Sequence, residues 1–150
     1  MPDIVGYWTG GSLYHIAWED DALALMENGT GYYFWFSAAE YDSFHTFRWK
    51  LDGDLLTLTS IKEYHFQGDE LIKPKKLSNN VVRFPSDTID VQVVRTIREG
   101  VGMKQIPALE FSQPFFYYTQ TEFGFDRSDV LEIDWHRQKV EQLKELGAWI

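Results

Sequence analysis

The sequence predicts a mainly β domain, in which about eight to ten antiparallel strands form a barrel and one helix lies near the C-terminus. Aromatic residues make up 17% of the 150 residues, and large flat side chains are more common in sheets and barrels than in helix bundles. Turn dipeptides separate short apolar runs in the first two thirds of the chain. Helical spacing of apolar residues is clearest at the C-terminal end.

Two dipeptides predict hairpins between consecutive strands. Asn28-Gly29 and Asp52-Gly53 each separate two runs of apolar and β-branched residues. Asn-Gly and Asp-Gly supply the positive φ angles of a type I′ turn, which joins adjacent antiparallel strands. A weaker third signal is the Gln-Gly-Asp sequence at residues 67–69. Two strong hairpins in succession predict a meander.

Side chains alternate between the two faces of a strand, so a period of two assigns the faces. Residues 30–36 and 115–121 are apolar on both faces, which suits strands that line a cavity or are covered on both sides. In residues 44–51 we expect the inward face to hold His45, Phe47, Trp49 and Leu51. In residues 89–97 we expect it to hold Ile89, Val91, Val93, Arg95 and Ile97. The predicted core includes Trp8, Phe47, Trp49, Val91 and Val93.

Two segments depart from the strand pattern. Residues 73–87 are rich in Pro, Asn and Lys, which is typical of a solvated loop or, alternatively, of a lid that contacts an anion. A helix is predicted over about residues 135–146, with Asp134 as its N-cap and Gly147 just past its end. The apolar residues that give its period are Trp135, Val140, Leu143 and Leu146.

Charge and length limit the possible partners. The chain has 14 Lys+Arg against 23 Asp+Glu, a formal net charge of −9, which repels phosphate backbones and anionic lipid. We therefore expect no nucleic-acid or membrane partner. There is no cysteine, so disulfides and thiolate metal sites are excluded. At 150 residues we expect a single domain over residues 1–150. No signal peptide or long apolar stretch is visible, so cytoplasmic residence is the default expectation.

The first predicted strand begins with Gly6-Tyr7-Trp8, and residues 47–58 form a strand, an Asp-Gly turn and a second strand. With the run of hairpin-linked strands and one late helix, this order resembles the lipocalin-like (calycin) β-barrel proteins, whose first strand often carries Gly-x-Trp. The resemblance implies an antiparallel barrel and a small, largely apolar ligand in its interior.

The sequence lacks the usual motifs of catalysis. There is no phosphate-binding loop, no His-Glu-x-x-His and no complete dinucleotide fingerprint. We therefore expect no catalytic residue and no cofactor, and an enzyme is left open as the weakest alternative. The histidines are interpreted as core or surface residues, with no metal bound. The acidic run Glu19-Asp20-Asp21 fits a solvated connection better than an acid/base pair or a cation site.

Arg95 is the most informative single residue, because its predicted inward position would bury a guanidinium. One interpretation is that Arg95 stacks on a tryptophan such as Trp8 and closes the barrel. A second is that Arg95 and the hydroxyl of Tyr32 or Tyr117 bind the carboxylate of an apolar ligand. A third is a slip of strand register that exposes Arg95.

Two functions fit these observations best. The first is a non-enzymatic binding protein that holds a small, largely apolar ligand, including one that carries a carboxylate. Its candidate ligand-binding residues are Arg95, His45, Tyr32, Tyr117 and Trp49. The alternative is an acidic protein–protein module, such as a bacterial immunity or inhibitor protein that masks a basic partner.

Overall fold

The computed structural model describes residues 4–9, 19–37, 41–67, 70–72, 88–113 and 121–127, together with Glu141. These residues contain nine strands. The strands are β1 (Gly6–Thr9), β2 (Glu19–Leu25), β3 (Thr30–Ser37), β4 (Tyr41–Asp52), β5 (Leu55–Gln67), β6 (Glu70–Ile72), β7 (Thr88–Glu99), β8 (Gln105–Phe111) and β9 (Glu122–Arg127).

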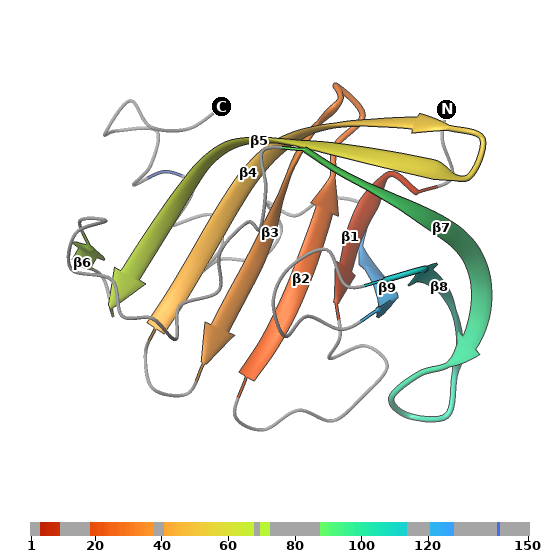
Figure 1. Cartoon of the computed structure of the whole chain (residues 1–150). Coiled ribbons are helices and arrows are strands. Elements are labelled where there is room, and N and C mark those ends of the chain that lie inside the picture. Colours follow the sequence, from red (N-terminus) through yellow and green to blue (C-terminus); the bar gives the residue numbers. More distant parts are fainter. Residues whose placement is uncertain are drawn as a thin grey trace.

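Eight of the strands form a closed ring (Figure 1). They are hydrogen-bonded in the order β4-β3-β2-β1-β9-β8-β7-β5, and a pairing of β4 with β5 closes the ring. All of these pairings are antiparallel, and β6 is added to the edge of β5 outside the ring. The sheet is a meander whose first strand pairs with its last described strand. The prediction of a mainly β, antiparallel, barrel-like fold is confirmed.

The hairpin predicted at Asn28-Gly29 is present, but its turn type differs from the expectation. Gly29 has a φ of 83°, whereas Asn28 does not have the positive φ that a type I′ turn requires. The backbone N–H of Gly29 donates to Met26 O (3.1 Å), and that of Met26 donates to Thr30 O (2.9 Å). This pattern is a type I turn followed by a left-handed glycine. The Asn28 side chain stabilises the turn by accepting a hydrogen bond from Thr30 N (3.0 Å).

The second hairpin, between β4 and β5, is also present, with its turn one residue later than expected. Asp52 is paired with Leu55, so the two loop residues are Gly53 and Asp54. Gly53 has a φ of 62°, and Asp54 has no positive φ. Glycine in the first loop position is the preference of a type II′ turn, so the type I′ expectation is wrong here too.

A hydrophobic cluster fills the inner face of the ring. The five residues predicted as core, Trp8, Phe47, Trp49, Val91 and Val93, all belong to it, and this prediction is confirmed. Its other buried members are Ile4, Leu23, Leu25, Tyr33, Leu56, Leu58, Ile89, Leu109, Phe111 and Phe123.

The indole of Trp49 links β4 to the β2–β3 hairpin. Its Nε1–H lies 3.0 Å from Met26 O and 2.9 Å from Thr30 O, so it donates to both carbonyls of the turn. Next to it on the inner face, Phe47 lies against the backbone of Gly31. A Cβ on Gly31 would collide with the backbone oxygen of Ala24 and come within 2.8 Å of the Phe47 ring, so this position requires glycine.

The inward alternation of β7 ends at Val93. Val91 and Val93 are buried, whereas Arg95 is exposed and Ile97 is 60% exposed. β7 is paired with β5 only as far as Gln92, and with β8 from Val93 onward. The later half of β7 therefore continues beyond its pairing with β5, and Arg95 is exposed there although its partner on β8, Leu109, belongs to the inner cluster. The prediction that Arg95 and Ile97 point into the core is wrong.

The outer face of β1–β5 carries a second buried cluster. Tyr32 and Phe34 belong to it, while Tyr33, between them, belongs to the inner cluster. The expected alternatives for residues 30–36 were a strand covered on both sides and one lining a cavity; the burial of Tyr32, Tyr33 and Phe34 agrees with the first. The outer cluster consists of Tyr7, Ala22, Ala24, Tyr32, Phe34, Phe44, Tyr64 and Phe66.

Several predicted features fall on parts of the chain that the structure does not describe. The helix over 135–146 is outside the described residues except for Glu141, and so are the loop 73–87 and nearly all of 115–121. The third hairpin is confirmed by the pairing of Gln67 with Glu70, although its two turn residues are not described. Among the residues that are described, no helix has the length and apolar character needed to cross a membrane.

Candidate functional site

Polar side chains occupy one end of the inner face of β2–β5. The strand register aligns Leu23, Tyr33, His45 and Glu63 in one row, because each is the partner of the next. The adjacent row, nearer the strand ends, contains Asp21, Trp35, Ser43 and His65. We call the six polar residues of these rows the polar end: Asp21, Tyr33, Ser43, His45, Glu63 and His65.

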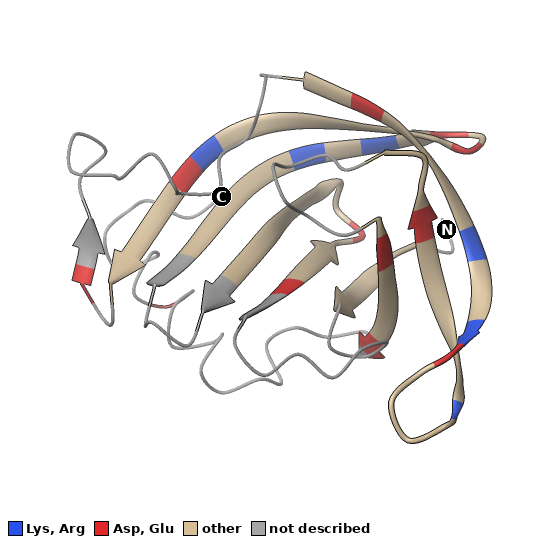
Figure 2. Cartoon of the chain, turned by 60° about the horizontal axis from the view of Figure 1, so that its bottom comes forward, with Lys and Arg blue, Asp and Glu red and all other residues tan. Residues whose placement is uncertain are grey.

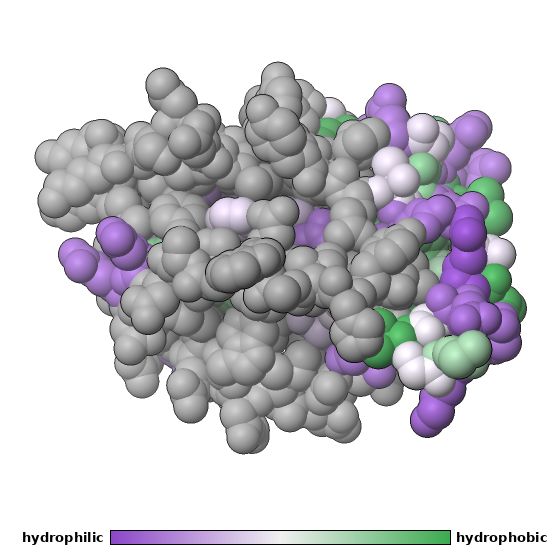
Figure 3. Space-filling view, turned by 90° about the horizontal axis from the view of Figure 1, so that it is seen from below, coloured by the Kyte–Doolittle hydropathy of each residue, from purple (hydrophilic) through white to green (hydrophobic). Residues whose placement is uncertain are grey.

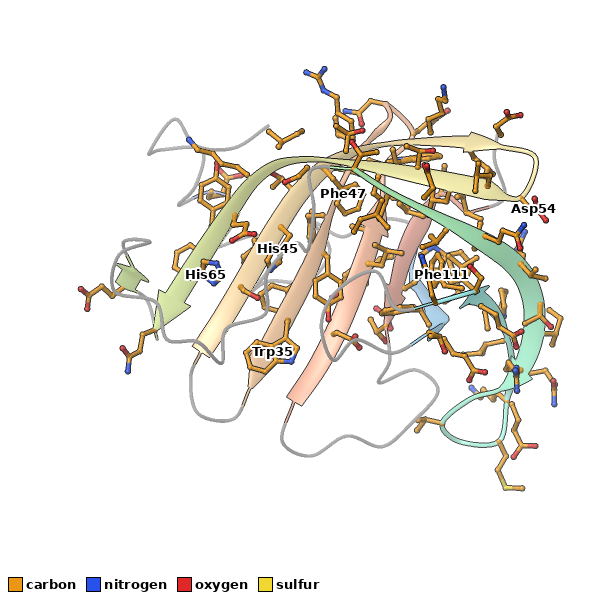
Figure 4. The ribbon with its side chains drawn as sticks, viewed as in Figure 1. Trp35, His45, Phe47, Asp54, His65 and Phe111 are labelled. Carbon is orange, nitrogen blue, oxygen red and sulfur yellow. The ribbon has the colours of Figure 1, made fainter. Side chains whose placement is uncertain are left out.

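The polar end borders directly on the apolar core. Figure 4 shows Trp35, His45 and His65 toward the lower ends of β3, β4 and β5, with Phe47 higher along β4. Phe47 is in the next row of the inner face, and Trp49 is in the row after it. The inner wall of β4 thus changes from polar to aromatic within a few residues.

Glu63 lies between the two histidines of the polar end. Its Oε1 is 3.7 Å from His45 Nδ1, and its Oε2 is 3.4 Å from His65 Nε2. The His45 side chain is fully buried and that of His65 is 3% exposed, whereas the Glu63 side chain is 27% exposed. The two imidazole rings meet edge to face, with centroids 5.7 Å apart. Glu63 is therefore the member of this group that reaches solvent.

A β-bulge places Glu63 and His65 inside the ring. β4 and β5 change register between Thr46 and Phe47, where Ile61 of β5 is left without a partner on β4. Leu58 and Ser60 point inward before the bulge, so unbroken alternation would continue the inner face with Lys62. Instead the bulge shifts the alternation by one residue, and Glu63 is paired with His45. Bulges often re-aim side chains in this way beside functional sites.

A second buried pair lies beside this group. The Tyr33 hydroxyl donates to Asp21 Oδ2 at 3.0 Å, and Asp21 is only 4% exposed. The Tyr33 ring is tilted toward His45, with centroids 6.0 Å apart. This pair connects the carboxylate of β2 with the histidines and Glu63 of β4 and β5.

Ser43 completes the row between Trp35 and His65. Its side chain is fully buried, and no described residue forms a hydrogen bond with its Oγ. Buried hydroxyl groups in folded proteins usually have a hydrogen-bond partner. Trp35, the neighbour of Ser43 on β3, is half-buried and packs against the inner cluster.

The structure brings together only part of the site predicted from the sequence. His45 is in the polar end and Trp49 is on the same inner face of β4, deeper in the core. Tyr32 lies on the outer face against Phe44, with ring centroids 5.6 Å apart, so the ring wall separates it from His45. Arg95 is exposed on β7.

One predicted site residue is not described, and the sequence analysis misplaced or missed several others. Tyr117 lies outside the described residues. Asp21 was expected in a solvated connection, but it lies on β2 with its side chain buried, so that interpretation is wrong. Sequence reasoning also missed Glu63, His65 and Ser43 as inner-face residues. The one available signal was Lys62, since a lysine at an expected inward position indicates that the alternation is broken.

The part of the chain that the structure describes contains no group of three or more His, Cys, Asp or Glu side chains placed to hold a metal ion. Comparisons with family models, with curated proteins and with solved structures give no match to this chain.

Proposed function

We propose that this chain is a binding protein that holds a small, largely apolar ligand inside the ring, with the polar group of the ligand at the polar end. The observation that carries the proposal is the change along the inner wall of β2–β5 from aromatic side chains to buried polar ones. Small-molecule sites are typically lined by apolar and aromatic side chains with a few polar groups that fix orientation. The resemblance to lipocalin-like barrels supports the same function.

The energetics of burial also support this proposal. Burying polar groups is costly unless they are hydrogen-bonded, and a stable core is more simply built from apolar side chains. Here a fully buried imidazole, a buried carboxylate and a buried hydroxyl lie within two rows of one wall. A ligand with polar and apolar parts would use both halves of that wall.

The test is a fluorescence titration with N-phenyl-1-naphthylamine, an uncharged apolar probe that brightens when it leaves water. We expect saturable binding to the wild type at one site per chain. Trp35→Ala should weaken binding about three- to tenfold, the range expected for one aromatic contact. Lys50→Ala, on the exposed outer face of β4, is the matched control and should bind like the wild type. Absence of saturable binding, or equal affinity in Trp35→Ala, would overturn the proposal.

A second candidate is the partner-binding role, in which this acidic chain covers a basic protein. The observation that favours it is the formal net charge of −9. One feature of the described surface weighs against it. Lys and Arg are spread over β4, β5 and the β7–β8 hairpin (Figure 2). That hairpin also exposes the apolar side chains of Ile97 (60%) and Met103 (81%), which suit a protein contact but not one made by charge, and Figure 3 shows hydrophobic surface on its right side. Partner binding becomes the better proposal only if the titration fails.

A further inference from the structure

We infer that the ligand is a small organic cation, a protonated amine with an aromatic or alkyl body, and that its ammonium group binds at the polar end. This inference rests on the proposed function and deepens it. It also replaces the carboxylate-bearing ligand that the expected position of Arg95 suggested.

Charge is the first reason. The polar end contains two carboxylates, Asp21 and Glu63, while no Lys or Arg lies on the inner face of β2–β5 among the described residues. Among the described residues, these two rows therefore contain two carboxyl groups and no Lys or Arg side chain. A ligand carboxylate would be repelled by both groups, and the repulsion is strong where water is excluded. An ammonium group would be attracted to both.

The second reason is Ser43, which is independent of the acidic residues. Its Oγ is buried on the inner face and has no hydrogen-bond partner among the described residues. Ser43 is the strand partner of His65, and the Nε2 atom of His65 is 3.4 Å from Glu63 Oε2. An ammonium N–H near Glu63 would supply the donor that this hydroxyl oxygen can accept.

The third reason is the aromatic character of the same rows. Trp35 lies between Asp21 and Ser43 in the register, and Tyr33 lies beside His45. Cations are attracted to the faces of aromatic rings, most strongly to that of tryptophan. Carboxylate, hydroxyl and indole together match an alkylammonium head, while Phe47 in the next row offers an apolar surface for its body.

The experiment is isothermal titration calorimetry at pH 7.5 with three ligands of the same skeleton. These are 2-phenylethylamine, which is a cation, 3-phenylpropanoate, which is an anion, and 2-phenylethanol, which is neutral. We expect the amine to bind at least tenfold more tightly than either of the others. Glu63→Gln should abolish most of that preference and leave the affinity for 2-phenylethanol nearly unchanged. Ser43→Ala should weaken the amine about threefold or more.

The matched control is Asp54→Asn, which removes one carboxylate from the exposed β4–β5 turn at the far end of these strands (Figure 4). It should keep the preference for the amine. Near-UV circular dichroism checks that each variant is folded, and if Glu63→Gln fails this check, Ser43→Ala still tests the site.

The outcomes separate the inference from the proposed function. Binding of 3-phenylpropanoate as tight as that of the amine would overturn the inference and leave the ligand-binding function intact. Amine binding that Glu63→Gln and Ser43→Ala leave unchanged would place the cation elsewhere and also overturn it. If the neutral naphthylamine probe binds and the amine does not, the cation preference is wrong. Failure of both would overturn the proposed function itself.

Discussion

Replacing Trp49 tests the assignment of the inner face of β4. The side chain is 9% exposed and packs in the inner cluster. Burial of about 200 Å² of aromatic surface at about 25 cal/mol/Å² gives an upper bound of about 5 kcal/mol. Trp49→Ala should therefore lower the free energy of unfolding by about 3–5 kcal/mol, as other large-to-small core substitutions do.

Trp49→Phe separates packing from hydrogen bonding. It keeps most of the ring but removes the Nε1–H that donates to Met26 O and Thr30 O. Both carbonyls also accept backbone hydrogen bonds within the turn, so neither is left without a partner. The expected loss is about 1–2 kcal/mol, of which a single hydrogen bond accounts for about 1.

The assay is urea unfolding followed by far-UV circular dichroism, with Lys50→Ala on the opposite face as the control. Lys50→Ala should change stability by less than about 0.5 kcal/mol. A loss below about 1 kcal/mol for Trp49→Ala would refute the face assignment, because a one-residue shift inverts both faces. Equal losses in Trp49→Ala and Trp49→Phe would mean that the hydrogen bonds, and not the packing, hold the turn.

Three further predictions concern other parts of the sheet. Gly31→Ala should destabilise by about 1–3 kcal/mol in urea unfolding, because the added Cβ would collide with the backbone oxygen of Ala24 and come within 2.8 Å of the Phe47 ring; no loss would contradict the close approach. Burial raises the pKa of the Tyr64 hydroxyl above its ordinary value of 10.0, so folding favours the neutral phenol. This contribution to the free energy of unfolding is complete below pH 10.0 and is lost as the pH rises through the folded-state pKa. Tyr64→Phe has no hydroxyl to ionise, so its free energy of unfolding should fall less than that of the wild type between pH 9 and about pH 11. Equal losses would contradict the burial effect. Arg98→Ala breaks an exposed pair of salt bridges to Glu110 and Glu122 and should cost less than about 1 kcal/mol, less still at high salt; a larger, salt-independent loss would contradict surface screening.

The fold could be predicted well where local chemistry decides it. Glycine in tight turns located the β2–β3 and β4–β5 hairpins, and a period of two assigned the inner face of β4 from His45 to Trp49. The same period gave the wrong burial for Arg95. Alternation tells on which face of a strand a side chain lies, but not whether other strands cover that face at that point. The extent of the β5–β7 pairing is a long-range property, and no local pattern around Arg95 reports it.

The candidate site was less predictable for a related reason. His45 was identified as an inner-face residue, but its neighbours Glu63 and His65 reach that face only through the bulge at Ile61. Asp21 lies in a run of acidic residues that is typical of a loop, and its burial follows from pairing with β3. Each of these positions depends on register between strands, which composition and spacing along one strand do not encode.

The closure of the ring also has a consequence for how this chain folds. Most of its strand pairs are hairpins that can form early from local segments, but β1 must find β9, and Tyr7 is paired with Arg127. Bringing such distant segments together costs loop entropy before any contact repays it, so the last seam should form late and limit the folding rate. β1 spans only Gly6–Thr9, so this seam is short. Until it forms, the hydrogen-bonding edges of β1 and β9 remain open to other chains, and a nascent or thermally opened molecule should aggregate through these two strands.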